Sequence, residues 1–147
     1  MAYSETNYKK YDGPGKIAVV NHLIEMGYNA VIRKEDKKAD LEIQDNHGGP
    51  IEYHEVEIKA KWIDAFKYKD VHIPKRKGKL RDRCAKEGRS VFFWVLNEPR
   101  TKAWFIWSDS LRDDRMIEKP VRNNDKPEQF FSIPIEECEL IELKGGK

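Results

Sequence analysis

Acidic and basic side chains alternate along one short stretch of the chain, residues 54–62. If this stretch is a β-strand, successive side chains point to opposite faces, and one face carries two acids and then two lysines: Glu55, Glu57, Lys59 and Lys61. The other face carries small and branched apolar residues, which suits packing against a core. A strand with a purely structural role rarely has two acids and two lysines in a row on one face. The pattern therefore marks a candidate functional site.

A second candidate strand, residues 39–44, lies upstream and carries Asp40 and Glu42 on one face. Between the two strands, the dipeptide Gly48-Gly49 is a strong turn signal, because glycine tolerates the positive φ angles of a tight hairpin. We therefore expect the strands to pair as a β-hairpin with a two-residue turn. A one-residue change of register would move every side chain to the other face, so the geometry of the site depends on this turn.

The expected register brings acids from the two strands together. Asp40 would lie opposite Glu57, and Glu42 would lie opposite Glu55; directly opposed side chains have Cβ atoms roughly 4.5–5.5 Å apart. Ionised carboxylates at that separation repel each other unless a cation lies between them. Oxygen ligands with few soft donors nearby favour a hard ion such as Mg²⁺. With Lys59 two residues beyond Glu57, the sequence predicts an acid–acid–lysine cluster.

Asp40, a hairpin and then Glu57-Ile58-Lys59 resemble the signature of the PD-(D/E)-x-K nuclease superfamily. Its members include type II restriction enzymes and archaeal Holliday junction resolvases. The resemblance covers about the first sixty residues as an ordered set: a helix, a strand, the Asp40 strand, the hairpin and the Glu57 strand. The chain departs from the signature at Ala39, where the superfamily often has proline.

The resemblance implies an α/β fold with a restriction-endonuclease-like core, in which a mixed central β-sheet is flanked by α-helices. It also implies a Mg²⁺-dependent DNA endonuclease, a phosphodiester hydrolase, with Mn²⁺ as a substitute ion and branched or structured DNA as a resolvase-like substrate. Asp40, Glu57 and the Ile58 carbonyl would bind the metal, and Lys59 would act on the attacking water or stabilise developing negative charge. Three further acids are accessory candidates: Glu55, Glu42 and Glu25.

The first helix is expected over residues 14–26, where apolar residues recur at helical spacing up to Gly27. A strand over residues 28–33 should follow and form an antiparallel meander with the hairpin. Resolvase-like nucleases often carry a metal-binding acid near the start of this helix, where this chain has Lys16. Glu25 is an acid near the other end of the helix, and the alternative interpretation is a solvated side chain.

Five further segments complete the expected fold. Residues 90–96 are almost entirely apolar and β-prone, which predicts a strand buried on both faces, with 103–107 as its returning partner. A short helix is expected over 108–115. We expect an edge strand at 130–134, because proline disfavours a central strand, and a tail strand at 138–143.

Composition indicates one globular domain, residues 1–147, with residues 1–11 as a loose polar arm. The chain is 39% hydrophobic and 37% charged, with a net charge of +2. Cys84 and Cys138 match no metal signature and make no disulfide framework. The sequence shows neither an apolar run of membrane-spanning length nor a signal peptide, so we expect a cytoplasmic protein without a membrane partner.

Positive charge is concentrated in the middle of the chain. Residues 61–90 contain eleven Lys or Arg against four Asp or Glu, a net charge of +7. We expect a helix over 74–87 whose basic side chains contact the phosphate backbone of DNA. The predicted DNA-binding residues are Lys61, Lys75, Arg76, Lys77, Lys79 and Arg81. The alternative is a solvated, charged helix face.

Three functions stay open at this stage: a metal-dependent DNA nuclease, a catalytically inactive DNA-binding module of the same fold, and a non-nuclease interaction protein in which the acids and lysines form salt bridges. A homodimer is expected, because one metal site cuts one strand and the resemblance suggests two sites related by a two-fold axis. Aromatic residues at 66–68 and 130–131 are candidate dimer contacts. The sequence does not distinguish DNA from RNA, linear from branched DNA, or one metal ion from two.

Overall fold

The structure is a computed structural model that describes residues 13–32, 40–45, 47–59, 62, 69–120 and 126–143. Six strands form one mixed sheet in the order β1-β2-β3-β5-β6-β9: Tyr28–Ile32, Leu41–Asp45, Glu52–Lys59, Val91–Asn97, Lys102–Trp107 and Glu139–Glu142. Three more form a small sheet in the order β4-β8-β7: Asp70–Pro74, Glu128–Pro134 and Met116–Lys119. The α-helices are α2 (Gly13–Glu25) and α3 (Lys77–Lys86).

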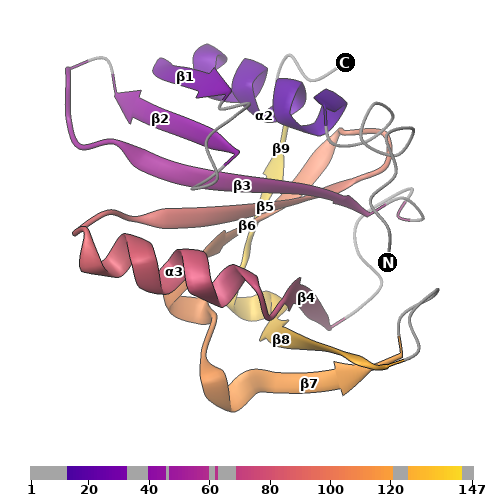
Figure 1. The fold of residues 1–147 in the computed structure, drawn as a ribbon. Coiled ribbons are helices and arrows are strands. Elements are labelled where there is room, and N and C mark those ends of the chain that lie inside the picture. Colours follow the sequence, from indigo (N-terminus) through magenta and orange to yellow (C-terminus); the bar gives the residue numbers. More distant parts are fainter. Residues whose placement is uncertain are drawn as a thin grey trace.

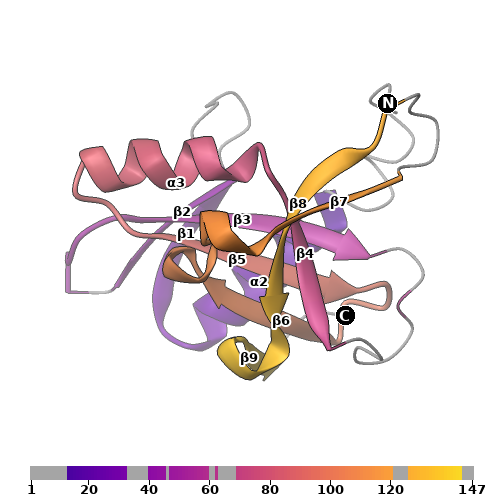
Figure 2. The ribbon, with the colours of Figure 1, turned by 90° about the horizontal axis from the view of Figure 1, so that it is seen from below.

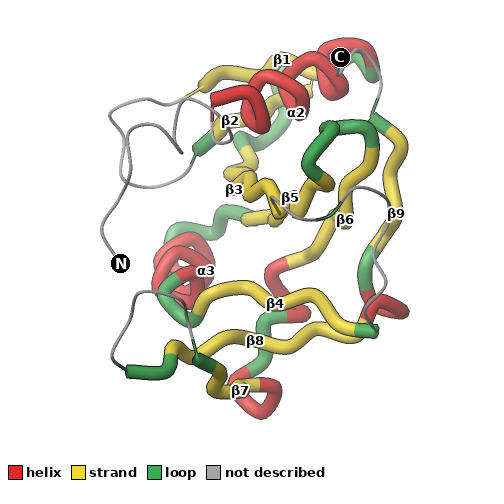
Figure 3. The backbone as a smooth tube through the Cα atoms, turned by 90° about the vertical axis from the view of Figure 1, so that its right-hand side faces the viewer, coloured by secondary structure: helices red, strands yellow, loops and turns green. Residues whose placement is uncertain are grey.

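The large sheet separates two layers. Helix α2 lies on one of its faces, whereas α3 and the small sheet lie on the other (Figures 1 and 3). Strand β3 contributes to both cores: Val56 and Ile58 pack with α2, and Tyr53 packs with α3 and the small sheet. Strand β5 is buried along its whole length. The expected α/β fold class, a mixed central sheet flanked by helices, is confirmed.

Strand β5 makes the sheet mixed. It runs parallel to β3, whereas the other neighbouring strands in this sheet are antiparallel. Parallel neighbours need a long crossover connection. Here the crossover contains β4 and α3, so it brings the basic helix to the face of the large sheet on which the small sheet also lies (Figures 1 and 2). Tyr53 packs on this side of β3.

Helix α3 begins three residues later than the sequence predicts and ends close to the expected residue. Pro74 belongs to β4 and pairs with Phe130, which delays the start of the helix. Gly78 lets the first turn approach the small sheet, since a Cβ there would lie 3.1 Å from the ring of Phe131. Gly88 follows the helix with φ +69°, a conformation that favours glycine.

Two expectations about the second half of the chain are wrong. Residues 130–134 were expected at an edge, but β8 is the middle strand of the small sheet. Pro134 is compatible with this position because β7 pairs with β8 only as far as Phe131, so at Pro134 the strand has a neighbour on one side only. Residues 108–115 form two separate 3₁₀ turns instead of one helix, with Leu111 buried between them.

The aromatic residues at 130–131 are not exposed. Phe130 and Phe131 are 8% and 1% accessible, so they stabilise the fold and do not form the expected dimer contact. Residues 66–68 lie outside the described residues. In the part of the chain that the structure describes, no helix is long and apolar enough to cross a membrane.

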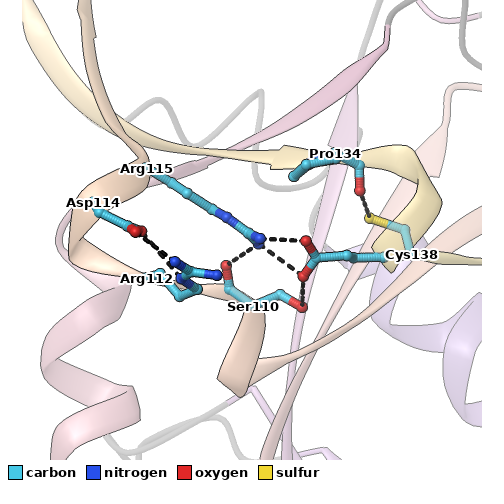
Figure 4. Close-up of polar contacts among 7 residues, drawn as sticks. Ser110, Arg112, Asp114, Arg115, Pro134 and Cys138 are labelled. Carbon is cyan, nitrogen blue, oxygen red and sulfur yellow. Dashed lines mark hydrogen bonds and ion pairs between the residues drawn. The ribbon is translucent and has the colours of Figure 1, made fainter.

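A polar cluster joins the connections on either side of the small sheet (Figure 4). Arg115 donates to Glu137 with both terminal nitrogens, and also to the main-chain oxygen of Ser110 at 3.1 Å. Ser110 itself donates to Glu137 at 3.3 Å. These contacts tie the turns after β6 to the turn after β8, and so fix the small sheet against the large one.

Candidate active site

The register of the β2–β3 hairpin differs from the predicted one by two residues. Leu41 pairs with His54 and Ile43 pairs with Glu52. Continuing this register by one position places Asp40 opposite Glu55, and not opposite Glu57. Because the shift is an even number of residues, the side chains keep their expected faces.

The turn explains the shift. Asp45 accepts hydrogen bonds from the main-chain N–H groups of His47 at 2.8 Å and Gly49 at 3.1 Å, so its side chain organises a longer loop. Gly48, with φ +76°, takes the left-handed position in that loop. These two main-chain hydrogen bonds also lower the pKa of the Asp45 carboxyl.

Asp40 is anchored to strand β3 by two hydrogen bonds. The N–H of Val56 donates to one carboxylate oxygen of Asp40 at 2.9 Å, and the N–H of Asp40 donates to the carboxylate of Glu55 at 2.6 Å. The other carboxylate oxygen of Asp40 lies 3.4 Å from Nζ of Lys16 on α2. The structure therefore brings together Asp40, Glu55 and Lys16.

Glu55 is a buried carboxylate, 8% accessible. Burial raises its pKa, the nearby charge of Asp40 raises it further, and the ammonium group of Lys77 opposes both. Lys77, from the first turn of α3, donates a short hydrogen bond to Glu55. The charge of Glu55 is thus compensated by a residue that the sequence had suggested for DNA binding.

Glu57 and Lys59 lie further along the same face of β3. Their side chains form an ion pair at 3.3 Å, and both are partly exposed. Glu42 pairs with Tyr53 across the hairpin, so it does not lie opposite Glu55. Each of the three acids of the site has a lysine partner: Asp40 has Lys16, Glu55 has Lys77 and Glu57 has Lys59.

Glu25 is not brought to Asp40. It is the exposed last residue of α2, nine residues beyond Lys16, which corresponds to about 13 Å along a helix axis. Near Asp40, at the start of the helix, the chain has Lys16 and not an acid. Among the described residues, no group of three or more His, Cys, Asp and Glu side chains is arranged to hold a metal ion by itself.

The predicted DNA-binding residues do not form one uniform surface, and Lys61 lies outside the described residues. Four of the others, together with Gly78, line a groove of about 710 Å³ between α3 and the small sheet: Lys75, Arg76, Lys79 and Arg81. Lys75 donates to Gln129 at 2.8 Å and Arg76 pairs with Glu128 at 3.2 Å. Arg81 contacts a main-chain oxygen and two aspartates. Several of these charges are therefore partly compensated within the fold.

Sequence reasoning missed a set of residues beside Lys59. Lys69, His72 and Lys119 line a cleft together with Lys59 and Trp62. The sequence gave a weak signal for Lys69, which belongs to the basic segment 61–90, and none for His72. It offered none for Lys119, because the strand that carries it, β7, was not predicted and lies far away in the sequence.

No protein-family model matches the sequence, and no curated protein matches it. Among solved structures, a similar chain is Hjc of Archaeoglobus fulgidus, a Holliday junction resolvase from an archaeal hyperthermophile. The two chains superpose with a TM-score of 0.48 at 12% sequence identity, over 85% of this chain and 97% of that chain. At this level of likeness, function has to be argued from the side chains of the chain itself.

Proposed function

We propose that the protein is a metal-dependent nuclease that hydrolyses phosphodiester bonds in DNA, with Asp40, Glu55, Glu57 and Lys59 as its active site. The observation that carries the proposal is the attachment of Asp40 to β3 through Val56 and Glu55. This attachment places the carboxylate of Asp40 beside a strand that presents Glu55, Glu57 and Lys59 on one face. Fixed acids beside a lysine suit chemistry on a phosphodiester.

The residue types fit a hard cation. The donors are carboxylate and main-chain oxygens, without sulfur or imidazole among the proposed ligands, and such donors suit Mg²⁺ or Mn²⁺. Mg²⁺ in nucleic-acid enzymes is commonly held by one or two carboxylates, with substrate phosphate oxygens and water completing the shell. One or two carboxylates are therefore enough to hold Mg²⁺ here, because the phosphate oxygens of a bound phosphodiester supply further ligands.

The roles proposed for Asp40, Glu57 and the Ile58 carbonyl are those that the resemblance to PD-(D/E)-x-K nucleases implies. Asp40, Glu57 and the carbonyl of Ile58 would hold the ion, and Glu55, now the neighbour of Asp40, would add negative charge to the site. A bound divalent ion would lower the pKa of a coordinated water and screen the charge on the phosphate. Lys59 orients the attacking water or stabilises the extra negative charge on the phosphate oxygens.

A second candidate function is an interaction or DNA-binding module in which this cluster is only structural. The pairing of Asp40, Glu55 and Glu57 with three lysines favours it, because opposite charges are already balanced without a metal. Thermal unfolding with and without Mg²⁺ separates the two functions. A ligand that binds the native state raises the melting temperature, whereas a self-compensated salt-bridge cluster gives no such increase.

The proposed function is tested by incubating the protein with labelled duplex, single-stranded and four-way-junction DNA, in Mg²⁺ and in chelator. The expected result is cleavage of at least one substrate in Mg²⁺ and of none in chelator. Intact DNA in every lane, together with an unchanged melting temperature in Mg²⁺, would contradict a nuclease and favour the second candidate. Size-exclusion chromatography of the protein at high concentration tests the homodimer, which stays a prediction.

A further inference from the structure

A cleft of about 470 Å³ opens directly beside Lys59. It lies between the end of β3 and the small sheet. Its lining residues come from four places in the sequence: Lys59; Trp62; Lys69, Asp70 and His72; and Lys119. Pockets of this size accommodate small ligands or a single nucleotide, whereas a whole duplex cannot enter one.

The walls of the cleft are held by contacts on both sides. The N–H of Trp62 donates to the Lys59 carbonyl at 3.0 Å, and the carbonyl of Trp62 accepts from the N–H of Glu98 at 2.7 Å. On the small sheet, Val71 and Ile73 are buried in the core, so His72 between them faces the other way. These contacts fix the main chain of Trp62 and the direction in which His72 points, and both residues line the cleft.

Lys119 is positioned by His72 and by an aromatic ring. Its Nζ lies 2.8 Å from Nδ1 of His72 and 4.5 Å from the centre of the Phe130 ring. Since an ammonium group can only donate, Nδ1 of His72 is the acceptor and the imidazole is neutral. The charge at this point of the cleft is therefore carried by the lysine.

Positive charge exceeds negative charge among the residues that line the cleft. Three lysines line it, whereas Asp70 is its one lining acid among the described residues. Glu57, which is paired with Lys59, and Glu128 also act on the charge of Lys119 from nearby. Burial and the charge of Lys59 lower the pKa of the Lys119 ammonium. Cations brought this close repel each other, and an anion placed between them removes the repulsion.

We propose that this cleft binds one nucleotide of a single-stranded DNA segment, with its phosphate held by Lys59, Lys69 and Lys119 and its base packed against Trp62. Basic side chains that follow the backbone, together with an aromatic residue, are the usual means of binding single strands. The inference rests on the proposed function in taking DNA as the ligand and in placing the bond that is cut beside the cleft. It assigns a substrate class, DNA with an unpaired segment next to the bond that is cut.

Binding in chelator tests the cleft without any cleavage. The probe is a short fluorescein-labelled single-stranded oligonucleotide, compared by anisotropy with the same sequence as a duplex and with the mononucleotide dAMP as competitor. Lys69→Gln, Lys119→Gln and Trp62→Leu should each weaken single-strand binding roughly five- to tenfold. Each lysine change should also reduce the salt dependence by about 0.7 in log–log slope. Lys119→Arg should restore affinity, and Lys86→Gln, an exposed lysine on α3, should change nothing.

The outcomes separate this inference from the proposed nuclease. Glu57→Gln should abolish cleavage in Mg²⁺ yet bind the oligonucleotide in chelator as tightly as the unchanged protein. If no DNA is cleaved but the cleft variants lose single-strand affinity, the cleft is supported and the nuclease fails. If cleavage occurs but the cleft variants, shown folded by circular dichroism, bind and cleave normally, the cleft assignment is overturned. Displacement of the oligonucleotide by dAMP at an equal concentration would also overturn it, because the site would then take free nucleotides.

Discussion

At the scale of single residues, Glu55 is a carboxylate buried beside a second carboxylate, and Lys77 compensates its charge. Lys77→Met should destabilise the fold by about 2 kcal/mol at neutral pH, because a buried charge would lose its charged hydrogen-bond partner. Urea denaturation measures this loss. The pKa of Glu55 is raised by folding, so the destabilisation should shrink as the pH falls through that raised pKa and the carboxyl becomes neutral.

Two comparisons decide whether the pair explains that loss. Lys79→Met, an exposed lysine on the same helix, should have little effect. Glu55→Gln combined with Lys77→Met should recover most of the stability, because no charge would be left unpaired. Equal losses in Lys77→Met and Lys79→Met would show that the ion pair does not contribute.

His54 links the stability of the fold to pH. Its Nδ1 accepts a hydrogen bond from the indole N–H of Trp94 at 2.7 Å, so the neutral ring carries its proton on Nε2, facing Glu52. Protonation of His54 would place an N–H donor on Nδ1, facing the indole N–H donor of Trp94. Burial lowers the pKa of His54 below its usual value of 6.5, although Glu52 opposes this shift.

A lowered histidine pKa means that the unfolded chain binds more protons than the folded protein at mildly acidic pH. Stability should therefore be full above pH 6.5 and fall as the pH drops from there toward the folded pKa. Urea denaturation at about pH 7.5 and about pH 5.5 measures this, and His54→Gln should show a smaller decrease. His72, whose pKa is also lowered, should account for part of the decrease that remains. An identical pH dependence in His54→Gln would assign the effect to other groups.

At the scale of secondary structure, the close approach of α2 to β3 depends on Gly15. A Cβ on this residue would lie 3.0 Å from side-chain atoms of Ile58. Gly15→Val should cost about 1–3 kcal/mol in denaturation experiments, because the added methyl groups force the helix away from the sheet. Gly15→Ala should be much milder, since alanine favours the helix by about 1 kcal/mol over glycine.

The effect of Gly15→Val should be specific to the buried face of α2. Glu25→Val places the same side chain at the exposed end of the helix and serves as the matched control. If both valine variants are equally stable, there is room for a larger side chain between α2 and Ile58, and the close approach at Gly15 does not matter for stability.

Apolar alternation was enough to predict most of the elements and the faces of β3, because burial imposes a period of two on a strand. It was not enough to predict the register of the hairpin. That register depends on the side chain of Asp45, which closes a loop longer than the Gly48-Gly49 dipeptide suggests. Sequence patterns gave the correct face of β3 but the wrong neighbour for Asp40.

At the scale of the whole molecule, the parts of the site that the sequence did not predict come from distant segments. Lys77 reaches Glu55 because the crossover between β3 and β5 carries α3 across the sheet. Lys119 lines the cleft because it lies on β7, a strand that the sequence pattern did not predict. Local periodicity contains no information about such contacts. The sequence showed that positive charge is concentrated in residues 61–90. It did not show that these residues are divided between the groove beside α3 and the cleft beside Lys59.

Four of the basic residues predicted from the sequence to bind DNA line the groove beside α3, which makes it the candidate surface for duplex DNA. Lys79→Glu should weaken binding to all duplex sequences about equally and flatten the salt dependence of binding, because a phosphate contact carries no sequence information. Anisotropy titrations at several salt concentrations, with Lys86→Glu as the control on the same helix, measure both effects. An unchanged affinity and salt slope in Lys79→Glu would move the duplex surface elsewhere.

Single-turnover cleavage of DNA by Lys59→Gln, with the Mg²⁺-induced rise in melting temperature measured on the same protein, tests the proposed active site most directly. Because this change leaves the acids in place, cleavage should fall by about 10²–10³ while the thermal response to Mg²⁺ persists. Glu57→Gln should lose both, and Glu42→Gln, which changes an acid that lies opposite Tyr53, should keep both. Full cleavage by Lys59→Gln or Glu57→Gln would show that β3 is only a scaffold, and would contradict the proposed nuclease site.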